Sequence, residues 1–250
     1  MSDEPAHLAL MLDAPLMSWG FASRFTRRTT ALHPTRSALT GMICAAAGAA
    51  KGSADEKTWL ERLHAVRLSV LTIPRRTAGG GPELPIRRLE DYHVTGGGYD
   101  RKTQAGSIPR KASGGPCDNP TVSWRHYLQD ARFGIILAGP APVLRDVARA
   151  LRDPRWGVWF GRKNCIPAAP LVRGEVARGR DTAMASLGLA GRSPEDFDRV
   201  EDAPSFADGV DTVMDMPVSF AAREFKPRRI LRRPRRGNGG SDAGLRAPAP

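Results

Sequence analysis

The order in which apolar segments follow one another constrains this fold more than any other feature of the sequence. Residues 7–14 are apolar on both faces and predict a central buried strand, and residues 66–73 predict a second strand beyond an intervening helix. After a long irregular stretch come a strand at 132–138, a helix that begins at Pro142 and a strand at 170–176. The order β-α-β-β-α-β predicts an α+β, ferredoxin-like fold with two helices on one face of a sheet.

The first helix carries an unusual charge. Thr35 is its expected N-cap, because apolar residues recur at helical spacing directly after it. Arg36 then stands in the first turn, where a cation opposes the helix dipole. An anion bound to the free N–H groups would offset that cost, since helix N-termini bind phosphate. The alternative is that Arg36 extends into water.

Residues 74–120 lack periodicity and are rich in glycine, proline and basic side chains. A loop of this length inside a compact domain is either functional or disordered. Within it, residues 89–95 fit one arm of a projecting hairpin. Further along, residues 123–129 resemble a short helical turn, residues 156–160 are strand-like, and residues 179–208 are polar and weakly patterned.

The composition changes near the end of the chain. A last strand is expected within residues 213–220, and seven basic residues then crowd between positions 226 and 236. Charged segments with few apolar residues cannot bury a core. We therefore expect one domain at 1–225, with an insertion at about 74–120, and a basic, disordered tail at 226–250.

The formal net charge of +12 predicts a polyanionic partner. Nucleic acid is the first candidate and a membrane surface the second, while a GC-rich genome that enriches arginine is a partial alternative explanation. The cysteines form no C-x-x-C pair, which argues against a zinc ribbon or a disulfide framework. They are Cys44, Cys117 and Cys165.

No uninterrupted apolar run reaches the roughly eighteen residues that a membrane span needs. Asp3 and Glu4 stand where a signal peptide would have basic residues. We therefore expect a cytoplasmic protein.

No motif for catalysis stands out. The sequence has no H-E-x-x-H, no G-x-S-x-G and no Walker loop. A metal-independent ribonuclease would need a base and an acid on either side of the scissile phosphate. The histidines available for this are His33, His93 and His126, and the one cluster of suitable types is Tyr92 and His93 with Lys102 or Lys111. We expect no catalytic residue, metal or cofactor.

Basic residues and rings spread over several loops favour single-stranded RNA binding, since cations bind phosphates and rings stack on splayed bases. The basic candidates are Arg24, Arg27, Arg28, Arg36, Arg110, Lys111, Arg162, Lys163 and Arg223. The candidate rings are Trp19, Tyr92, His93 and Trp124. Each ring has a structural alternative: Trp19 would cap the sheet edge, whereas Trp124, Trp156 and Trp159 fit a core.

Five stretches, in order along the chain, resemble the CasD family of CRISPR-associated proteins from type I-E Cascade complexes. They are LDAPLMSWG (12–20) with PTRSALTGM (34–42), LEDYHV (89–94), WRHYLQDA (124–131), GRKNC (161–165) and FAAREF (220–225). The glycine-rich segment 96–116 and the chain after Phe225 are not covered by this resemblance.

The resemblance implies a non-catalytic subunit that binds the 5′ handle of the crRNA through a RAMP-type, RRM-like core. It places a thumb-like β-hairpin within residues 74–120. The implied partners are the crRNA, the CasC backbone subunits and the CasA large subunit, with target DNA near the PAM as a further candidate. Matching positions imply handle contacts at Trp19, Arg36, Ser37, Arg162, Lys163 and Arg223, and thumb roles at Tyr92 and His93.

Two other hypotheses stay open. Relatives from type I-C systems cleave precursor crRNA, so a metal-independent endoribonuclease is the enzymatic alternative. A general RNA- or DNA-binding protein outside CRISPR is the third, and it would show no preference for a repeat-derived 5′ end.

Overall fold

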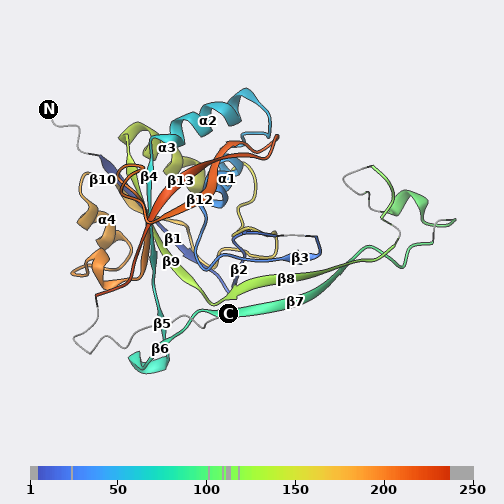
Figure 1. The fold of residues 1–250 in the computed structure, drawn as a ribbon, viewed down its shortest axis with the longest axis horizontal. Helices are drawn as coiled ribbons and strands as arrows, with labels where there is room; N and C mark the ends of the chain where they lie inside the picture. Colours follow the sequence, from blue (N-terminus) through green and yellow to red (C-terminus); the bar gives the residue numbers. More distant parts are fainter. Residues whose placement is uncertain are drawn as a thin grey trace.

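A seven-stranded antiparallel sheet forms the body of the protein, in the order β10-β1-β9-β4-β11-β13-β12 (Figure 1). The computed structural model describes residues 5–23, 25–100, 102–108, 110, 114–117 and 119–236. The strands of this sheet are β1 (Ala6–Asp13), β4 (Arg67–Thr72), β9 (Arg132–Gly139), β10 (Val172–Ala177), β11 (Arg199–Asp202), β12 (Asp211–Ser219) and β13 (Glu224–Arg233).

The strands β10, β1, β9 and β4 have the order expected of split βαβ units, since the fourth strand lies beside the first and the third beside the second. Helices α1 (Arg36–Ala46) and α2 (Ala54–His64) connect β1 to β4, and α3 (Ala141–Arg152) connects β9 to β10. Thr35 caps α1 as predicted, because its Oγ1 accepts a hydrogen bond from the Ala38 N–H at 3.3 Å. The predicted α+β class is confirmed.

Both faces of this sheet are covered. Leu8 and Leu12 of β1 pack into the main core with residues of α1 and α3. Their neighbours Ala9 and Met11 point to the other face and pack against α4 (Arg180–Ser186). This face of β1 is therefore not open to a stacked base, because α4 buries it.

A long hairpin of β7 (Arg87–Thr95) and β8 (Thr121–Gln129) projects from the body (Figure 1). The prediction of one arm at 89–95 is confirmed, but the helical turn expected at 123–129 is wrong. Those residues form β8, which pairs with β7 and also with β2 (Leu16–Met17) and β3 (Arg27–Arg28). The partner strands supply hydrogen bonds that the local sequence does not reveal. The second arm thus lies beyond residue 120.

Several smaller elements complete the fold. They are β5 (Arg75–Arg76), which pairs with β6 (Glu83–Leu84), and the 3₁₀ turns η1 (Ala78–Gly80), η2 (Ala105–Ser107) and η3 (Pro194–Asp196). The weakly patterned residues 179–208 contain α4, η3 and β11. Residues 156–160, expected to be strand-like, form no strand. In the part of the chain that the structure describes, no helix has both the length and the apolar character to cross a lipid bilayer.

The segment predicted as a disordered tail contains β13, an inner strand of the sheet that pairs with β11 and β12. The expectation fails for residues 226–233, and the sheet extends past the expected boundary at 225. Residues 237–250 lie outside the described residues. The prediction failed because the arginines here looked like solvated charge, whereas Arg228 is only 7% exposed and is paired inside the protein.

A buried ion-pair network joins α1 to these C-terminal strands. Arg36 Nη1 donates to Asp202 Oδ2 at 2.7 Å, and Arg36 Nη2 donates to the backbone carbonyl of Leu63 at 2.6 Å. Arg228 donates to Asp215 Oδ1 at 2.6 Å and also pairs with Asp202. Burial opposes the charge of Arg228, but the hydrogen bond and charge of Asp215, followed by those of Asp202, outweigh it and raise the arginine pKa.

Asp215 also contacts the N-terminus of α1. Its Oδ2 accepts a hydrogen bond from the backbone N–H of Arg36 at 2.8 Å. The anion at the N-terminus of α1 is therefore a carboxylate of the protein itself, and it satisfies a free N–H group of the first turn.

We expect Arg228→Leu to lower the free energy of unfolding by about 3–5 kcal/mol, because it leaves buried carboxylates without their partner. Chemical denaturation of the full chain measures this. Arg152→Leu is the matched control, since Arg152 pairs with Glu175 at 2.7 Å on the surface of α3; we expect about 0–1 kcal/mol there. Equal losses in the two variants would contradict the role assigned to the network.

Candidate nucleic-acid interface

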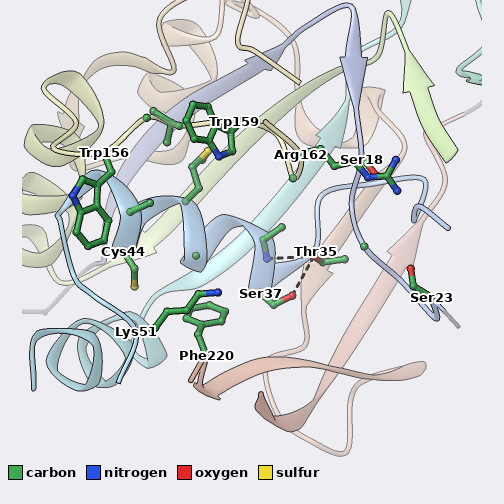
Figure 2. A pocket seen from close by; sticks show the side chains of 18 of the residues that line it. Ser18, Ser23, Thr35, Ser37, Cys44, Lys51, Trp156, Trp159, Arg162 and Phe220 are labelled. Atoms are coloured by element: carbon green, nitrogen blue, oxygen red, sulfur yellow. Dashed lines mark hydrogen bonds between the residues drawn. The ribbon is translucent and has the colours of Figure 1, made fainter. Parts of the chain in front are cut away.

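An open groove of about 800 Å³ runs along α1 (Figure 2). Its walls come from segments far apart in the sequence: the loop that precedes β3, residues 156–162 after α3, the start of α2 and the turn between β12 and β13. Small residues of α1 line it, namely Ala38, Gly41 and Ala45. The Phe220 ring packs against Gly41, where an added Cβ would lie 3.4 Å from the ring.

The groove is strongly cationic. Its basic lining residues are Arg28, Lys51, Arg125 and Arg162. Of the described residues that line it, only Glu56 is acidic, and that side chain is 3% exposed and accepts a hydrogen bond from the Gly52 N–H at 3.0 Å. A concave surface with one sign of charge attracts an anionic ligand.

Arg162 is held by the loop that follows Trp159. The Ser18 N–H donates to the Phe160 carbonyl at 3.0 Å, and Gly161 adopts a φ of 94° where a Cβ would overlap the Ser18 carbonyl oxygen. The Arg162 guanidinium lies 4.6 Å from the centre of the Tyr127 ring and donates from Nη2 to the Arg28 carbonyl at 3.0 Å. Within the described part of the chain, its buried Nη1 has no hydrogen-bond partner.

Aromatic side chains form the other part of the groove. Trp156 is 45% exposed and Trp159 is 38% exposed, so the expectation that they belong to the core is wrong. Figure 2 shows them on one side of α1, with Phe220 and Lys51 on the other. Phe220 packs edge-on against Phe225, with ring centroids 6.4 Å apart.

Three of the sequence-predicted contact regions meet at this groove. Ser37 and Arg162 line it, and Lys163 is an exposed neighbour of Arg162 in the same loop. Arg223 is exposed in the turn between β12 and β13, with a φ of 55°, and the same turn brings Phe220 to the groove.

Trp19 and Arg36 need correction as RNA contacts. Trp19 is 1% exposed, with its ring 5.7 Å from that of Phe160, so it cannot stack on a base. Arg36 is 5% exposed, and its guanidinium is bonded to Asp202 and to backbone carbonyls. Both side chains serve the core instead of a ligand. Arg24 and Lys111 lie outside the described residues.

The predicted thumb residues lie on the hairpin. Tyr92 is 61% exposed and meets the Trp124 ring edge-on at 5.5 Å, and the Arg27 guanidinium lies 5.7 Å from the same ring. His93 follows Tyr92 in β7 and therefore points to the opposite face of the hairpin, where Asp91 is 3.3 Å away. Arg110, between β7 and β8, donates to the Gly114 carbonyl at 3.0 Å and does not line the groove.

Sequence reasoning missed several lining residues: Lys51, Arg125, Trp156, Trp159 and Phe220. Arg125 and Phe220 occur in stretches that carried the family resemblance, and that was a usable signal. The two tryptophans stand in a W-G-V-W segment that only Phe160 separates from GRKNC, and the strand-like pattern expected there gave no sign of their exposure.

The three histidines considered for a ribonuclease have separate partners among the described residues. His33 lies 3.3 Å from Arg232, and its pKa is lowered mainly by burial. His93 pairs with Asp91, whereas His126 Nε2 lies 2.6 Å from Glu90.

Cys44 lines the groove as a buried thiol. Burial, followed by the charge of Glu56, raises the pKa of the Cys44 thiol to about 12, so this lining cysteine stays protonated. The described residues contain no cluster of three or more side chains able to hold a metal ion.

Comparison with known proteins identifies the family. The family model described as CRISPR-associated protein (Cas_Cas5) matches residues 7–232. The chain belongs to the Cas5 family of CRISPR-associated proteins.

Similar proteins agree with this assignment. The Cascade subunit CasD of Escherichia coli strain K12 is 28% identical over 178 residues, which cover 68% of this chain and 70% of that protein. A chain of a CRISPR RNA-guided surveillance complex is 27% identical, with a TM-score of 0.67 over 92% of this Cas5 chain and 90% of the other. A crystal structure of a Cas protein is 25% identical, with a TM-score of 0.59 over 90% and 93% of the two chains.

Gly161→Ala should disrupt the loop that carries Arg162. The added Cβ would overlap the Ser18 carbonyl at a positive φ, so we expect the free energy of unfolding to fall by more than about 1 kcal/mol. Thermal or chemical denaturation checks this. Gly20→Ala is the control, because it also lines the groove but its Cβ would meet no atom within 4 Å. A stable Gly161→Ala variant would show that the loop is not held by this close approach.

Proposed function

We propose that this Cas5-family chain is a non-catalytic subunit of a type I-E CRISPR Cascade complex that binds the 5′ handle of the crRNA in the groove along α1. One observation carries the proposal: four of the five stretches that resemble the family supply lining residues to the same groove. They contribute Ser18, Ser37, Arg125, Arg162 and Phe220, among others. Residues distant in sequence thus converge on one cationic surface, as a nucleic-acid site requires.

The chemistry of the groove suits a single-stranded RNA end. Guanidinium and ammonium groups bind phosphates, which positions the strand without reading its sequence, and exposed rings accept splayed bases. In a guide complex, base pairing reads the target sequence, so the protein needs only this backbone and end recognition. We assign the handle contacts to Ser37, Arg162, Lys163 and Arg223, and add Arg28, Lys51 and Arg125.

The similar proteins support the same assembly. CasD of Escherichia coli is a Cascade subunit, and the structural neighbour belongs to an RNA-guided surveillance complex. We therefore assign β10, β1, β9 and β4 to a ferredoxin-like RAMP core and the β7–β8 hairpin to the thumb, with Tyr92 and His93 facing neighbouring subunits. CasC and CasA are the proposed protein partners in the cytoplasm, and target DNA near the PAM is a further one. Arg27 and Arg110 stay candidate RNA contacts on the hairpin side.

The proposal predicts the behaviour of the double variant Arg162→Gln with Lys163→Gln. We expect weaker crRNA retention and a log affinity that falls less steeply with log salt, by roughly 0.7 for each phosphate that the protein no longer neutralises. Co-purification of crRNA from the co-expressed complex, and RNA titrations at several salt concentrations, measure the two effects.

Arg152→Gln is the matched control. This arginine of α3 forms an ion pair with Glu175 of β10 and does not line the groove. Unchanged retention and salt slope in the double variant would count against the groove as the handle site.

One contact favours the enzymatic alternative, a metal-independent endoribonuclease that processes precursor crRNA. His126 Nε2 lies 2.6 Å from Glu90, and Arg27 lies 3.8 Å from the same carboxylate, on the face of the hairpin that carries Tyr92. Such a pair has the residue types of acid–base catalysis. Incubation of the chain with its repeat RNA in EDTA decides: cleavage at one site, abolished by His126→Gln, would favour the nuclease, and an intact RNA favours the binding subunit.

A further inference from the structure

The groove has two chemically different ends, and we propose that its aromatic end is a subsite for one unpaired nucleobase, stacked on Trp159 or Trp156. This inference rests on the proposed function, because the base belongs to the RNA strand whose phosphates lie at the basic end. The basic end is made by Arg28, Arg125 and Arg162. The tryptophans lie at the other end of the groove (Figure 2). A single RNA strand would therefore place phosphates at the arginines and a base at the rings.

The tryptophans are held in place by the backbone. The Arg155 N–H donates to the Ala46 carbonyl at the end of α1 at 2.8 Å, and the Phe160 N–H donates to the Cys165 carbonyl at 2.8 Å. The segment 156–159 is thus fixed at both ends. The Trp159 ring lies against Gly157, where a Cβ would overlap it. Two exposed rings on a fixed segment form a stacking platform that loses little conformational freedom on binding.

The space between the rings and α1 also fits. The whole groove, with both of its ends, holds about 800 Å³, which lies within the roughly 300–1,000 Å³ of small-molecule sites. The side of α1 that lines the groove carries the small residues Ala38, Gly41 and Ala45. Their side chains leave the space beside the rings open.

Charge favours a nucleobase over an apolar side chain of a partner protein. Lysine is depleted at protein interfaces, whereas this groove carries Lys51 beside Phe220 (Figure 2). Three arginines line the other end of the groove. Base–aromatic stacking tolerates such surroundings, because the phosphates of the same strand neutralise the cations.

A coupling experiment tests the subsite. The full chain is titrated with a single-stranded RNA of roughly ten nucleotides in which one abasic nucleotide is moved along the strand. For the unaltered chain, we expect one position at which removal of the base lowers the affinity by about 5-fold to 100-fold. In the double variant Trp156→Leu with Trp159→Leu, we expect that penalty to disappear, because two partners of one contact do not contribute independently.

Two further variants complete the design. Phe206→Leu is the control, since this aromatic residue is 67% exposed and does not line the groove; it should keep the full abasic penalty. The variant with both tryptophans changed to phenylalanine keeps stacking rings, so it should retain most of the penalty and remains informative if the leucine variant does not fold.

An abasic penalty that persists unchanged in the folded leucine variant overturns the subsite. So does a leucine variant that keeps its RNA affinity but no longer co-purifies with partner proteins, since the rings would then be a protein contact. If the unaltered chain binds neither the RNA probe nor crRNA, the proposed function itself fails. If it binds both without any base-dependent position, only the subsite fails.

Discussion

The buried pairing of Arg36 and Arg228 with Asp202 and Asp215 is the interaction on which the rest of this structure depends. It binds the N-terminus of α1 to strands β11, β12 and β13, which lie outside the four-stranded split βαβ sheet. Because β12 and β13 are held there, the turn between them reaches α1 and supplies Phe220 and Phe225 to the groove. The proposed RNA-binding surface therefore depends on a polar contact made in the interior.

The same contact explains why net charge alone is a poor guide to the site. Many arginines of this basic chain are already neutralised by nearby carboxylates, as Arg152 is by Glu175 and Arg180 by Glu201. Among the described residues, the cations that line the groove share it with a single carboxylate, that of Glu56, which is buried and accepts a hydrogen bond from a backbone N–H. In the proposed function, this local imbalance, and not the total of +12, attracts the phosphates of the RNA.

The fold was largely predictable because its strands and helices carry periodic apolar patterns, as β1 and α3 do. Predictions failed where distant partners override local signals: residues 123–129 became a strand through pairing with β7, and residues 226–233 became an inner strand through Asp202 and Asp215.

The site was predicted in part. Ser37 and Arg162 reach the groove, whereas Trp19 and Arg36 are buried and the exposed tryptophans were assigned to the core.

The sequence by itself determined the α+β class, the cap of α1, the first arm of the hairpin and the family, because these follow from short-range pattern and from motifs that stay in order along the chain. Only the tertiary structure decided which cations are engaged by internal carboxylates and which remain for a ligand, and which rings are open to solvent. An arginine or a tryptophan is the same residue in the sequence whether its side chain is paired inside the protein or free to bind a ligand. Its role depends on neighbours that lie more than a hundred residues away, as Asp202 does from Arg36, and pairing of that range leaves no periodic trace in one sequence.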